Sequence, residues 1–367
     1  MKTGISMKHK NTYVAIMAGG IGSRFWPSSR TNRPKQFLDI MGTGESLIQT
    51  TFNRFRKLVD ADRIFIVTNV IYKDLVKEQL PELTDNQIIC EPSRNNTAPC
   101  VALTALKIHA LNPDANLVIA PSDHLILKED VFLEKINEAV SFATDNEALL
   151  TLGIHPTRPD TGYGYINYEL EGNSSVKKVN RFTEKPNAEV AQSFLDSGDY
   201  VWNAGIFIWS TKSILAAFKA HASEIHSILS SDPSVFNTEN EQAFIDSEYP
   251  KTPSISVDYA IMEQAENIYT LPADIGWSDL GTWASLYAES EKDEADNVIN
   301  NISHKHITEV TNSFIRTSSD KLVVIKGLDD YIVIDEDDVL LIYPKSEEQN
   351  IKQVNGQIKD QFGDKYL

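Results

Sequence analysis

Short apolar runs alternate with longer amphipathic segments over the first third of the chain. Short apolar runs predict buried strands, and segments with apolar residues at every third or fourth position predict helices. The predicted strands are Tyr13–Ala18, Arg63–Thr68, Gln87–Cys90 and Asn116–Ala120, and the predicted helices are Glu45–Leu58, Val70–Leu80 and Thr97–Ala110. This βαβ alternation predicts an α/β fold with a Rossmann-like, mixed but mostly parallel sheet flanked by helices. Ligands are then expected outside the carboxyl ends of the strands.

The pattern changes in the second half of the chain. TGYGYINYE and VKKVNRFTEKP predict hairpin or edge strands, followed by helices at 188–196, 212–220 and 257–265 and a strand-like run at 201–209. After the charged segment ESEKDEAD, the runs SFIRT, LVVIKG, YIVID and VLLIYP predict a small all-β domain, with a β-helix as one arrangement and a closing helix. The predicted division is an N-terminal extension at 1–11, a main domain at 12–290 and a β-rich domain at 291–367.

Composition and charge exclude several classes of function. The 367 residues are 41% hydrophobic, which suits a sizeable core, and the formal net charge of −18 argues against nucleic acid or an anionic membrane as partner. The polar, basic start and the lack of an apolar run of about 18 residues predict a cytoplasmic protein. Cys90 and Cys100 lack CxxC or HxxxH spacing, which favours two reduced thiols over a disulfide or zinc site.

A glycine-rich loop with fixed cations follows the first predicted strand. Gly19, Gly20 and Gly22 allow a tight turn and a close approach of the backbone to a ligand, and consecutive N–H groups in such a turn can bind an anion. Arg24 and Lys35 add positive charge. The loop therefore predicts a binding site for the phosphates of a nucleotide.

Two commoner glycine loops do not fit these residues. A GxGxxG dinucleotide fingerprint fails because Phe25 stands where the third glycine belongs, which disfavours a nicotinamide-dependent dehydrogenase. A Walker A loop fails because no GxxxxGK followed by Ser or Thr occurs. A plain turn with solvated Arg and Lys is the remaining structural alternative.

Two carboxylates are candidate metal ligands. Asp123 in LVIAPSDH comes just after a predicted strand, and Asp279 lies in GWSDLGTW. Together they can hold a divalent cation, with Mg²⁺ expected and Mn²⁺ as the alternative. A helix N-cap is the structural alternative for Asp123.

AGGIGSRFWPSSR followed by PKQFL resembles the signature of sugar-1-phosphate nucleotidylyltransferases. The WP and PKQF details are similar to the mannose-1-phosphate guanylyltransferase branch of that family. The resemblance implies GTP and mannose 1-phosphate as substrates, with GDP-mannose and pyrophosphate as products of a metal-assisted, in-line attack on the α-phosphorus. It implies a catalytic set of Arg24, Lys35, Asp123, Lys185 and Asp279.

Three further motifs, FTEKP, EPSRNNTAP and WNAGIFIW, extend the resemblance to roughly Tyr13–Tyr287, and the last is similar to the family's sugar-binding strand. FTEKP is similar to the family motif whose Glu binds sugar hydroxyls and whose Lys binds the sugar phosphate, and a solvated strand edge is its alternative. EPSRNNTAP resembles the base-recognition loop, although Asn95 stands where Arg is common, and helix capping is its alternative. The residues carried over are Glu184, Lys185 and Asn203 with Gly164 for the sugar phosphate, and Glu91, Asn96 and Thr97 for the base.

Other functions stay open at this point. Within the same class, another hexose 1-phosphate or another nucleoside triphosphate is an alternative substrate, because the amino-acid sequence does not give the shape of the binding pocket. From a different class, it can be a catalytically silent, nucleotide-sugar-binding regulatory homologue. A catalytically silent homologue is not expected to retain the complete set of charged residues named above. This sequence retains all of them, namely Arg24, Lys35, Asp123, Lys185 and Asp279. A homodimer is a further expectation.

Overall fold

The computed structural model describes residues 10–317 and 320–367. Most of the predicted extension at 1–11 therefore lies outside the described residues. The described chain forms two compact units. The first contains the described residues before Gly20, Thr51–Ser122 and Ile126–Trp277, and the second contains Gly20–Thr50, Asp123–Leu125 and Ser278–Leu367. The predicted boundary at residue 290 stays a prediction, whereas these contacts place the glycine loop with the C-terminal strands.

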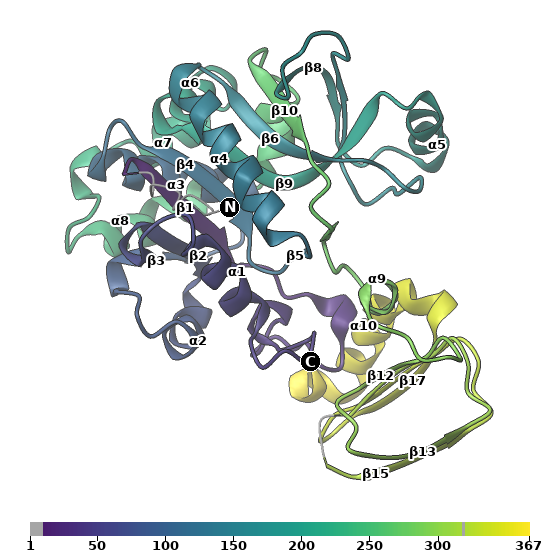
Figure 1. Cartoon of the computed structure of the whole chain (residues 1–367). Coiled ribbons are helices and arrows are strands. Elements are labelled where there is room, and N and C mark those ends of the chain that lie inside the picture. The colour runs from purple at the N-terminus through teal and green to yellow at the C-terminus, as the bar shows by residue number, and fades with distance from the viewer. Residues whose placement is uncertain (1–9, 318–319) are drawn as a thin grey trace, which may run out of the picture. The chain divides into compact units, whose positions relative to one another are not determined.

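The first unit is built on a nine-stranded sheet with the order β3-β2-β1-β4-β9-β6-β10-β8-β7 (Figure 1). Strands β3, β2, β1 and β4 are parallel neighbours, whereas β9 is antiparallel to both β4 and β6. The α/β fold class is confirmed, and the predicted hairpin is the antiparallel pair β7 and β8. The strands are β1 (Thr12–Met17), β2 (Ile64–Asn69), β3 (Ile88–Glu91), β4 (Asn116–Pro121), β6 (Leu149–Ile154), β7 (Tyr165–Tyr168), β8 (Lys177–Thr183), β9 (Tyr200–Ser210) and β10 (Ile268–Pro272).

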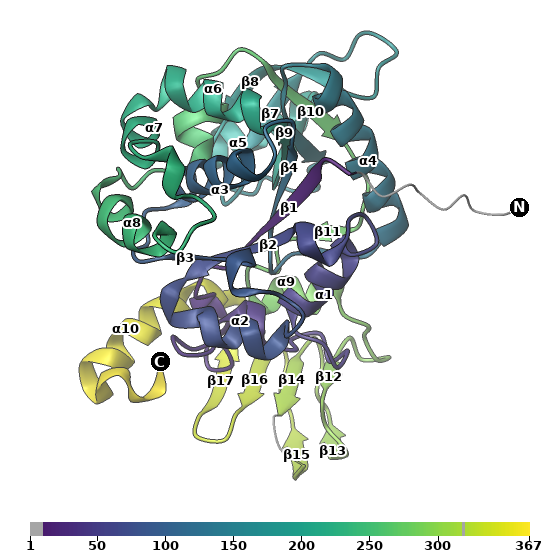
Figure 2. The same ribbon diagram turned by 90° about the vertical axis from the view of Figure 1, so that its left-hand side faces the viewer.

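Helices cover both faces of this sheet. Figure 2 shows α3, α6 and α7 on one face and α4 on the other. The helices of the first unit are α2 (Lys73–Gln79), α3 (Thr97–Leu111), α4 (Glu129–Asp145), α5 (Ala188–Ser197), α6 (Thr211–His221), α7 (Ser223–Leu229) and α8 (Glu241–Glu248). Three short elements fall at the unit boundaries, namely α1 (Leu47–Phe55), β5 (Leu125–Ile126) and β11 (Trp277–Ser278).

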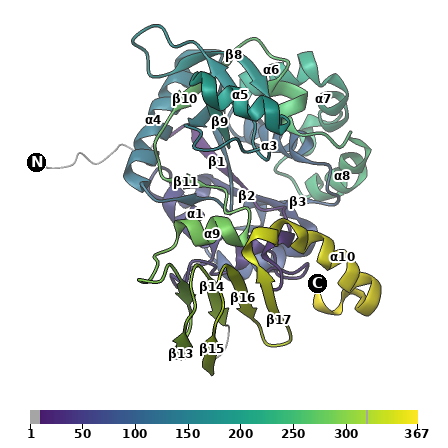
Figure 3. The ribbon, with the colours of Figure 1, turned by 90° about the vertical axis from the view of Figure 1, so that its right-hand side faces the viewer.

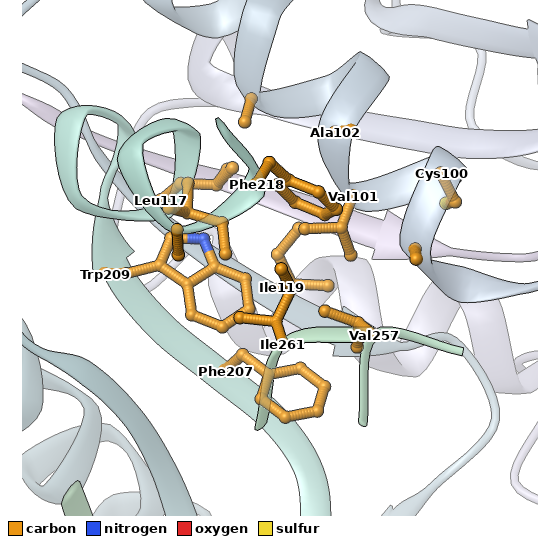
Figure 4. Packing of buried hydrophobic residues seen from close by; sticks show 14 of the residues in the cluster. Cys100, Val101, Ala102, Leu117, Ile119, Phe207, Trp209, Phe218, Val257 and Ile261 are labelled. Atoms are coloured by element: carbon orange, nitrogen blue, oxygen red, sulfur yellow. The ribbon is translucent and has the colours of Figure 1, made fainter. Parts of the chain in front are cut away.

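The core of the first unit lies between the sheet and the helices α3, α6 and α7. Phe207 and Trp209 of β9 pack with Leu117 and Ile119 of β4, beneath Phe218 of α6 (Figure 4). These five side chains are at most 2% exposed, so this face of the sheet is a rigid support for the loops at the strand ends.

Two sequence predictions need correction here. The segment 257–265 was expected to be a helix but forms only a π-helical turn, Asp258–Met262. Helix α4 was not predicted, although Phe132, Ile136 and Val140 have helical spacing and are buried.

The second unit contains parallel strands that stack in register. Val298 lies beside Phe314 and Phe314 beside Ile332, so that β12, β14 and β16 follow one another (Figure 2). Strands β13 and β15 form a second parallel pair (Figure 3). This is the stacking of successive turns of a short β-helix, the arrangement that the strand-like runs allowed. The strands of the second unit are β12 (Val298–Asn300), β13 (His304–Thr308), β14 (Phe314–Thr317), β15 (Leu322–Lys326), β16 (Tyr331–Asp335) and β17 (Leu340–Pro344). Its helices include α9 (Trp283–Glu289) and α10 (Ile351–Phe362).

None of the helices in the described part of the chain has the length and apolar character needed to cross a membrane.

Candidate functional site

The glycine loop in the second unit has a geometry that requires glycine at one position. Gly22 has a φ of 68°, and a Cβ atom added there would lie 2.5 Å from Cβ of Lys35. A side chain at this position would therefore be strained in its backbone and would also displace Lys35. Gly20 is exposed, and nothing lies within 4 Å of a Cβ added to it. The main chain of this turn is open to a ligand, as an anion-binding loop needs.

Lys35 is the centre of a buried polar cluster in the second unit. Its Nζ atom lies 2.8 Å from Oδ2 of Asp123 and donates to the carbonyl oxygens of Asp279 at 3.0 Å and Leu280 at 2.8 Å. An ammonium group has three N–H donors, and these three partners use them all. Lys35 therefore fixes Asp123 against the segment that carries Asp279. Its predicted role as a phosphate ligand stays a prediction.

The carboxylate of Asp123 is held in its ionised form. Burial raises its pKa, but the charges of Lys35 and His124 and the hydrogen bond from Lys35 outweigh this effect, so the pKa lies below its usual value. An ionised carboxylate is the form that binds a cation.

Asp279 is oriented by the turn that follows it. The Gly281 N–H donates to Oδ1 of Asp279 at 3.1 Å, and a Cβ atom at residue 281 would lie 2.8 Å from Oδ2. The donor set of Asp123 and Asp279 consists of oxygen atoms only, which fits Mg²⁺ or Mn²⁺ better than zinc. Among the described residues, no three His, Cys, Asp or Glu side chains gather as a metal cage. Two carboxylates are enough for Mg²⁺ where substrate phosphates and water complete its coordination.

Arg24 lies in the 3₁₀ turn Ser23–Phe25 and is exposed. Its positive charge acts on Glu348 of the same unit. Burial raises the pKa of Glu348, and a hydrogen bond from the Ala284 N–H, at 2.6 Å, and the charge of Arg24 act in the opposite direction. Sequence reasoning missed Glu348, because nothing in its local sequence marks it as a partner of the glycine loop.

In the first unit, the predicted base-recognition residue Glu91 ends β3 and is 9% exposed. Its Oε1 accepts a hydrogen bond from the Tyr249 hydroxyl, and its Oε2 would lie 3.6 Å from a Cβ atom on Gly19. Burial raises the pKa of Glu91 to about 7, against the lowering effect of hydrogen bonds from Tyr249 and Cys100. Glu91 can therefore gain or lose its charge near neutral pH.

Asn96 and Thr97 organise the start of α3. Asn96 has a φ of 67° and caps the helix by accepting a hydrogen bond from the Thr97 N–H at 2.8 Å. The Thr97 hydroxyl accepts from the Val257 N–H at 2.9 Å. Capping is therefore present at this loop, and the predicted contact with the base stays a prediction.

The four predicted sugar residues come together in the first unit. A Cβ atom on Gly164 would lie 2.5 Å from Oε2 of Glu184, and the Gly164 carbonyl accepts from the Asn203 N–H at 2.8 Å. Lys185 forms an ion pair with Glu184, while 58% of the Lys185 side chain is exposed. A nearly buried carboxylate, an exposed ammonium and an amide therefore share one surface, which suits hydroxyls beside a phosphate.

Asp258 belongs to this group and was missed from the sequence. Its Oδ1 accepts a hydrogen bond from Nδ2 of Asn203 at 2.9 Å. Burial and the negative charge of Glu184 raise the pKa of Asp258 to about 6, although Lys185 acts against them. The apolar periodicity of SVDYAIMEQ suggested a helix face, but a lone Asp within such a run was a signal for a polar site.

The family model for nucleotidyl transferases matches residues 13–296. The chain belongs to this family. A mannose-1-phosphate guanylyltransferase of Salmonella montevideo is 38% identical over 353 residues, covering 94% of this chain and 73% of the relative. The enzyme of the same name from Escherichia coli K12 is 37% identical over 368 residues, covering 96% and 74%.

A solved structure supports the fold along nearly the whole chain. It is the protein called mannose-1-phosphate geranyltransferase from Thermus thermophilus, with a TM-score of 0.85 and 26% identity, covering 95% of this chain and 99% of that protein. The present nucleotidyl transferase spans about three-quarters of the length of the two bacterial relatives.

Proposed function

We propose that this nucleotidyl transferase converts GTP and mannose 1-phosphate into GDP-mannose and pyrophosphate. The observation that carries the proposal is the cluster in which one buried lysine, Lys35, links Asp123 to the segment that bears Asp279. A chain with no catalytic duty has little reason to bury Lys35 and to use its three donors on Asp123 and on the carbonyls of Asp279 and Leu280. The names of the bacterial relatives support the choice of guanine and mannose.

The phosphate-binding part of the proposal rests on the second unit. Gly20 and Gly22 offer main-chain N–H groups to the triphosphate, and Arg24 contributes a planar guanidinium that can contact two phosphate oxygens. Asp123 and Asp279 would hold Mg²⁺, with Mn²⁺ as the alternative. The bound cation would reduce the charge repulsion between the α-phosphoryl oxygens and the attacking phosphate.

The sugar and base contacts rest on the first unit. Glu184 and Asn203 would bind sugar hydroxyls, while Lys185 would bind the sugar phosphate. Glu91 would accept the adjacent N1–H and amino groups of guanine, which adenine does not present together. Asn96 and Thr97 would shape the loop that receives the base.

The proposed chemistry is a direct in-line attack of the sugar phosphate on the α-phosphorus. The attacking phosphate is already deprotonated near neutral pH, so it needs no enzymatic base, and alignment with charge stabilisation supplies the catalysis. The two cysteines suit no nucleophilic role, because both are buried and burial raises the pKa of each thiol.

A matrix assay tests the proposed function. Pyrophosphate release is measured for each of four nucleoside triphosphates with mannose, glucose and galactose 1-phosphates, in the presence of Mg²⁺. We expect the highest kcat/KM for GTP with mannose 1-phosphate and GDP-mannose as its product. A higher value for another pair would reassign the substrates, and binding without release in every pair would indicate a silent homologue. A homodimer and a cytoplasmic location stay predictions, to be checked by sedimentation and by cell fractionation.

A further inference from the structure

The glycine loop has little regular structure of its own. Between Gly20 and Phe37, the chain forms two 3₁₀ turns, Ser23–Phe25 and Lys35–Phe37, and one isolated β-bridge between Arg30 and Arg33. The main-chain polar groups of such a segment need partners from elsewhere to keep one shape. Several of these bonds form within the loop, such as Lys35 N–H to Ile21 O, whereas the carbonyls of Ser23 and Trp26 take their partners from residues after Ser278 in the same unit.

Three hydrogen bonds tie the loop to distant parts of the second unit. The amide of Asn355 in α10 donates to the Ser23 carbonyl at 3.0 Å, and the indole of Trp283 donates to the Trp26 carbonyl at 3.1 Å. The Trp26 indole donates to the Tyr366 carbonyl at 2.7 Å. These contacts hold the two residues on either side of Arg24 and Phe25 on fixed supports.

Charged pairs hold the next stretch of the loop. Arg30 forms two hydrogen bonds with Asp338, one of them 2.9 Å long from Nη1, and the Ser28 hydroxyl donates to Glu336. Asp338 and Glu336 lie in the turn that connects β16 and β17. The turn of the β-helix therefore supports the loop from a second direction.

Two aromatic residues of the loop, Phe25 and Trp26, are buried against the β-helix, α9 and α10. Phe25 and Trp26 are at most 5% exposed, and Phe25 packs on Trp283 with ring centroids 4.8 Å apart. They belong to one cluster with residues of the β-helix and of α10, namely Phe314, Ile332, Ile334, Leu341 and Ile351.

Two side chains of the support are difficult to explain by stability alone. Oδ1 of Asn355 is buried without a hydrogen-bond partner, and Glu348 is a half-buried carboxylate whose pKa is raised by burial. Each costs free energy that an apolar residue would not cost. Asn355 nevertheless holds the residue before Arg24, and Glu348 holds the N–H of Ala284 beside Trp283, whose indole binds the Trp26 carbonyl of the loop.

We propose that Glu348 and Asn355 are positioning residues that hold the glycine loop, and Arg24 within it, in the shape that binds the triphosphate. The proposal gives the C-terminal β-helix and α10 a role in the reaction beyond the stability of the fold. It rests on the proposed function only for the identity of the nucleotide.

The test uses Asn355→Ala and Glu348→Ala in the full chain, with Gln353→Ala as the matched control. Gln353 is exposed on the same helix as Asn355. Hydrogen exchange of loop peptides from 20–35 is measured without ligand, together with GTP binding and the KM for each substrate. We expect loop exchange to rise about tenfold and GTP affinity to fall about tenfold in both variants, which is the effect of losing one buried hydrogen bond. The KM for mannose 1-phosphate and the exchange of the nine-stranded sheet should stay unchanged.

Glu348→Gln separates the hydrogen bond of Glu348 from its charge. Gln keeps an acceptor for the Ala284 N–H but removes the negative charge on which Arg24 acts, so we expect it to restore the slow exchange and to lower kcat alone. Loop exchange in the Ala variants equal to that of Gln353→Ala would overturn the proposal. An equal loss for both substrates with a lower Tm would also overturn it, since that is the effect of a merely structural role. Failure of the unaltered chain to bind GTP would contradict the proposed function, while the exchange data would still decide the positioning role.

Discussion

Glu91 and Asp258 in the first unit and Asp123 in the second unit have opposite electrostatic surroundings. In the first unit, Glu91 and Asp258 have raised pKa values, about 7 and about 6, and their hydrogen-bond partners are neutral side chains. In the second unit, Lys35 holds Asp123 ionised, so that the pKa of Asp123 is lowered. Neutral hydrogen-bond partners suit ligands without charge, such as a base and sugar hydroxyls, whereas a directly paired carboxylate and ammonium suit phosphates and a cation. We therefore expect the first unit to bind the base and the sugar hydroxyls, and the second unit to bind the triphosphate and the cation.

The largest expected effect is the loss of a charge from the second unit. Asp123→Asn and Asp279→Asn should each lower kcat about 1,000-fold or more, because each removes an anionic oxygen ligand for the cation. Asp360→Asn, on the exposed face of α10, is a matched control and should keep kcat. Steady-state turnover at saturating Mg²⁺ checks this, and near-normal turnover in either variant would rule that residue out as a metal ligand.

Arg24→Lys tests whether the glycine loop needs a planar guanidinium or only a positive charge. Lys keeps the charge but cannot reproduce the planar fork, so kcat should fall about 100 to 1,000-fold with a modest change in GTP affinity. Direct titration of GTP binding beside turnover is the measurement. Weak GTP binding with normal turnover at saturation would make Arg24 a ground-state anchor instead.

Lys185→Ala tests the exposed ammonium beside Glu184 in the first unit. We expect the KM for mannose 1-phosphate to rise about 10 to 100-fold while the KM for GTP stays constant, since an exposed ammonium is lost from one substrate. Lys35→Ala is expected to act on the triphosphate and on Asp123. The reverse pattern in the two Michaelis constants would contradict this assignment.

The smallest effect concerns pH and Glu91. A carboxyl with a pKa of about 7 is about one-tenth ionised at pH 6 and about nine-tenths ionised at pH 8, so GTP affinity should rise about tenfold over this range. Stability should change in the opposite sense. The raised pKa means that the folded chain keeps a proton that the unfolded chain releases near pH 4.5, so this contribution is lost as pH rises through 7.

Glu91→Gln is the reference for both pH profiles. At each pH, the GTP affinity of the unaltered chain is divided by that of Glu91→Gln. This ratio corrects for the titration of GTP itself, which is the same in both measurements. A ratio that does not vary with pH would show that ionised Glu91 takes no part in binding, and parallel unfolding curves at pH 5 and 8 would contradict the raised pKa.

The sequence predicted the elements better than their partners. The alternation of β1 to β4 with helices follows from local periodicity, and the family motifs brought Glu184, Lys185 and Asn203 to attention. The supports of the glycine loop could not be predicted, because Ser23 and Asn355 are 332 positions apart and Trp26 and Tyr366 are 340 positions apart. Asp258 was missed because an apolar run with helical spacing concealed a single polar residue.

The most direct test of the proposed mechanism is the stereochemistry at the α-phosphorus. GTP carrying a single sulfur of known configuration on the α-phosphorus is converted with mannose 1-phosphate, and the configuration of the sulfur-labelled GDP-mannose is determined. One in-line attack by the sugar phosphate predicts inversion of configuration. Retention would require two displacements through a nucleotidyl-enzyme intermediate, and would contradict a mechanism in which the chain only aligns its substrates and stabilises their charge.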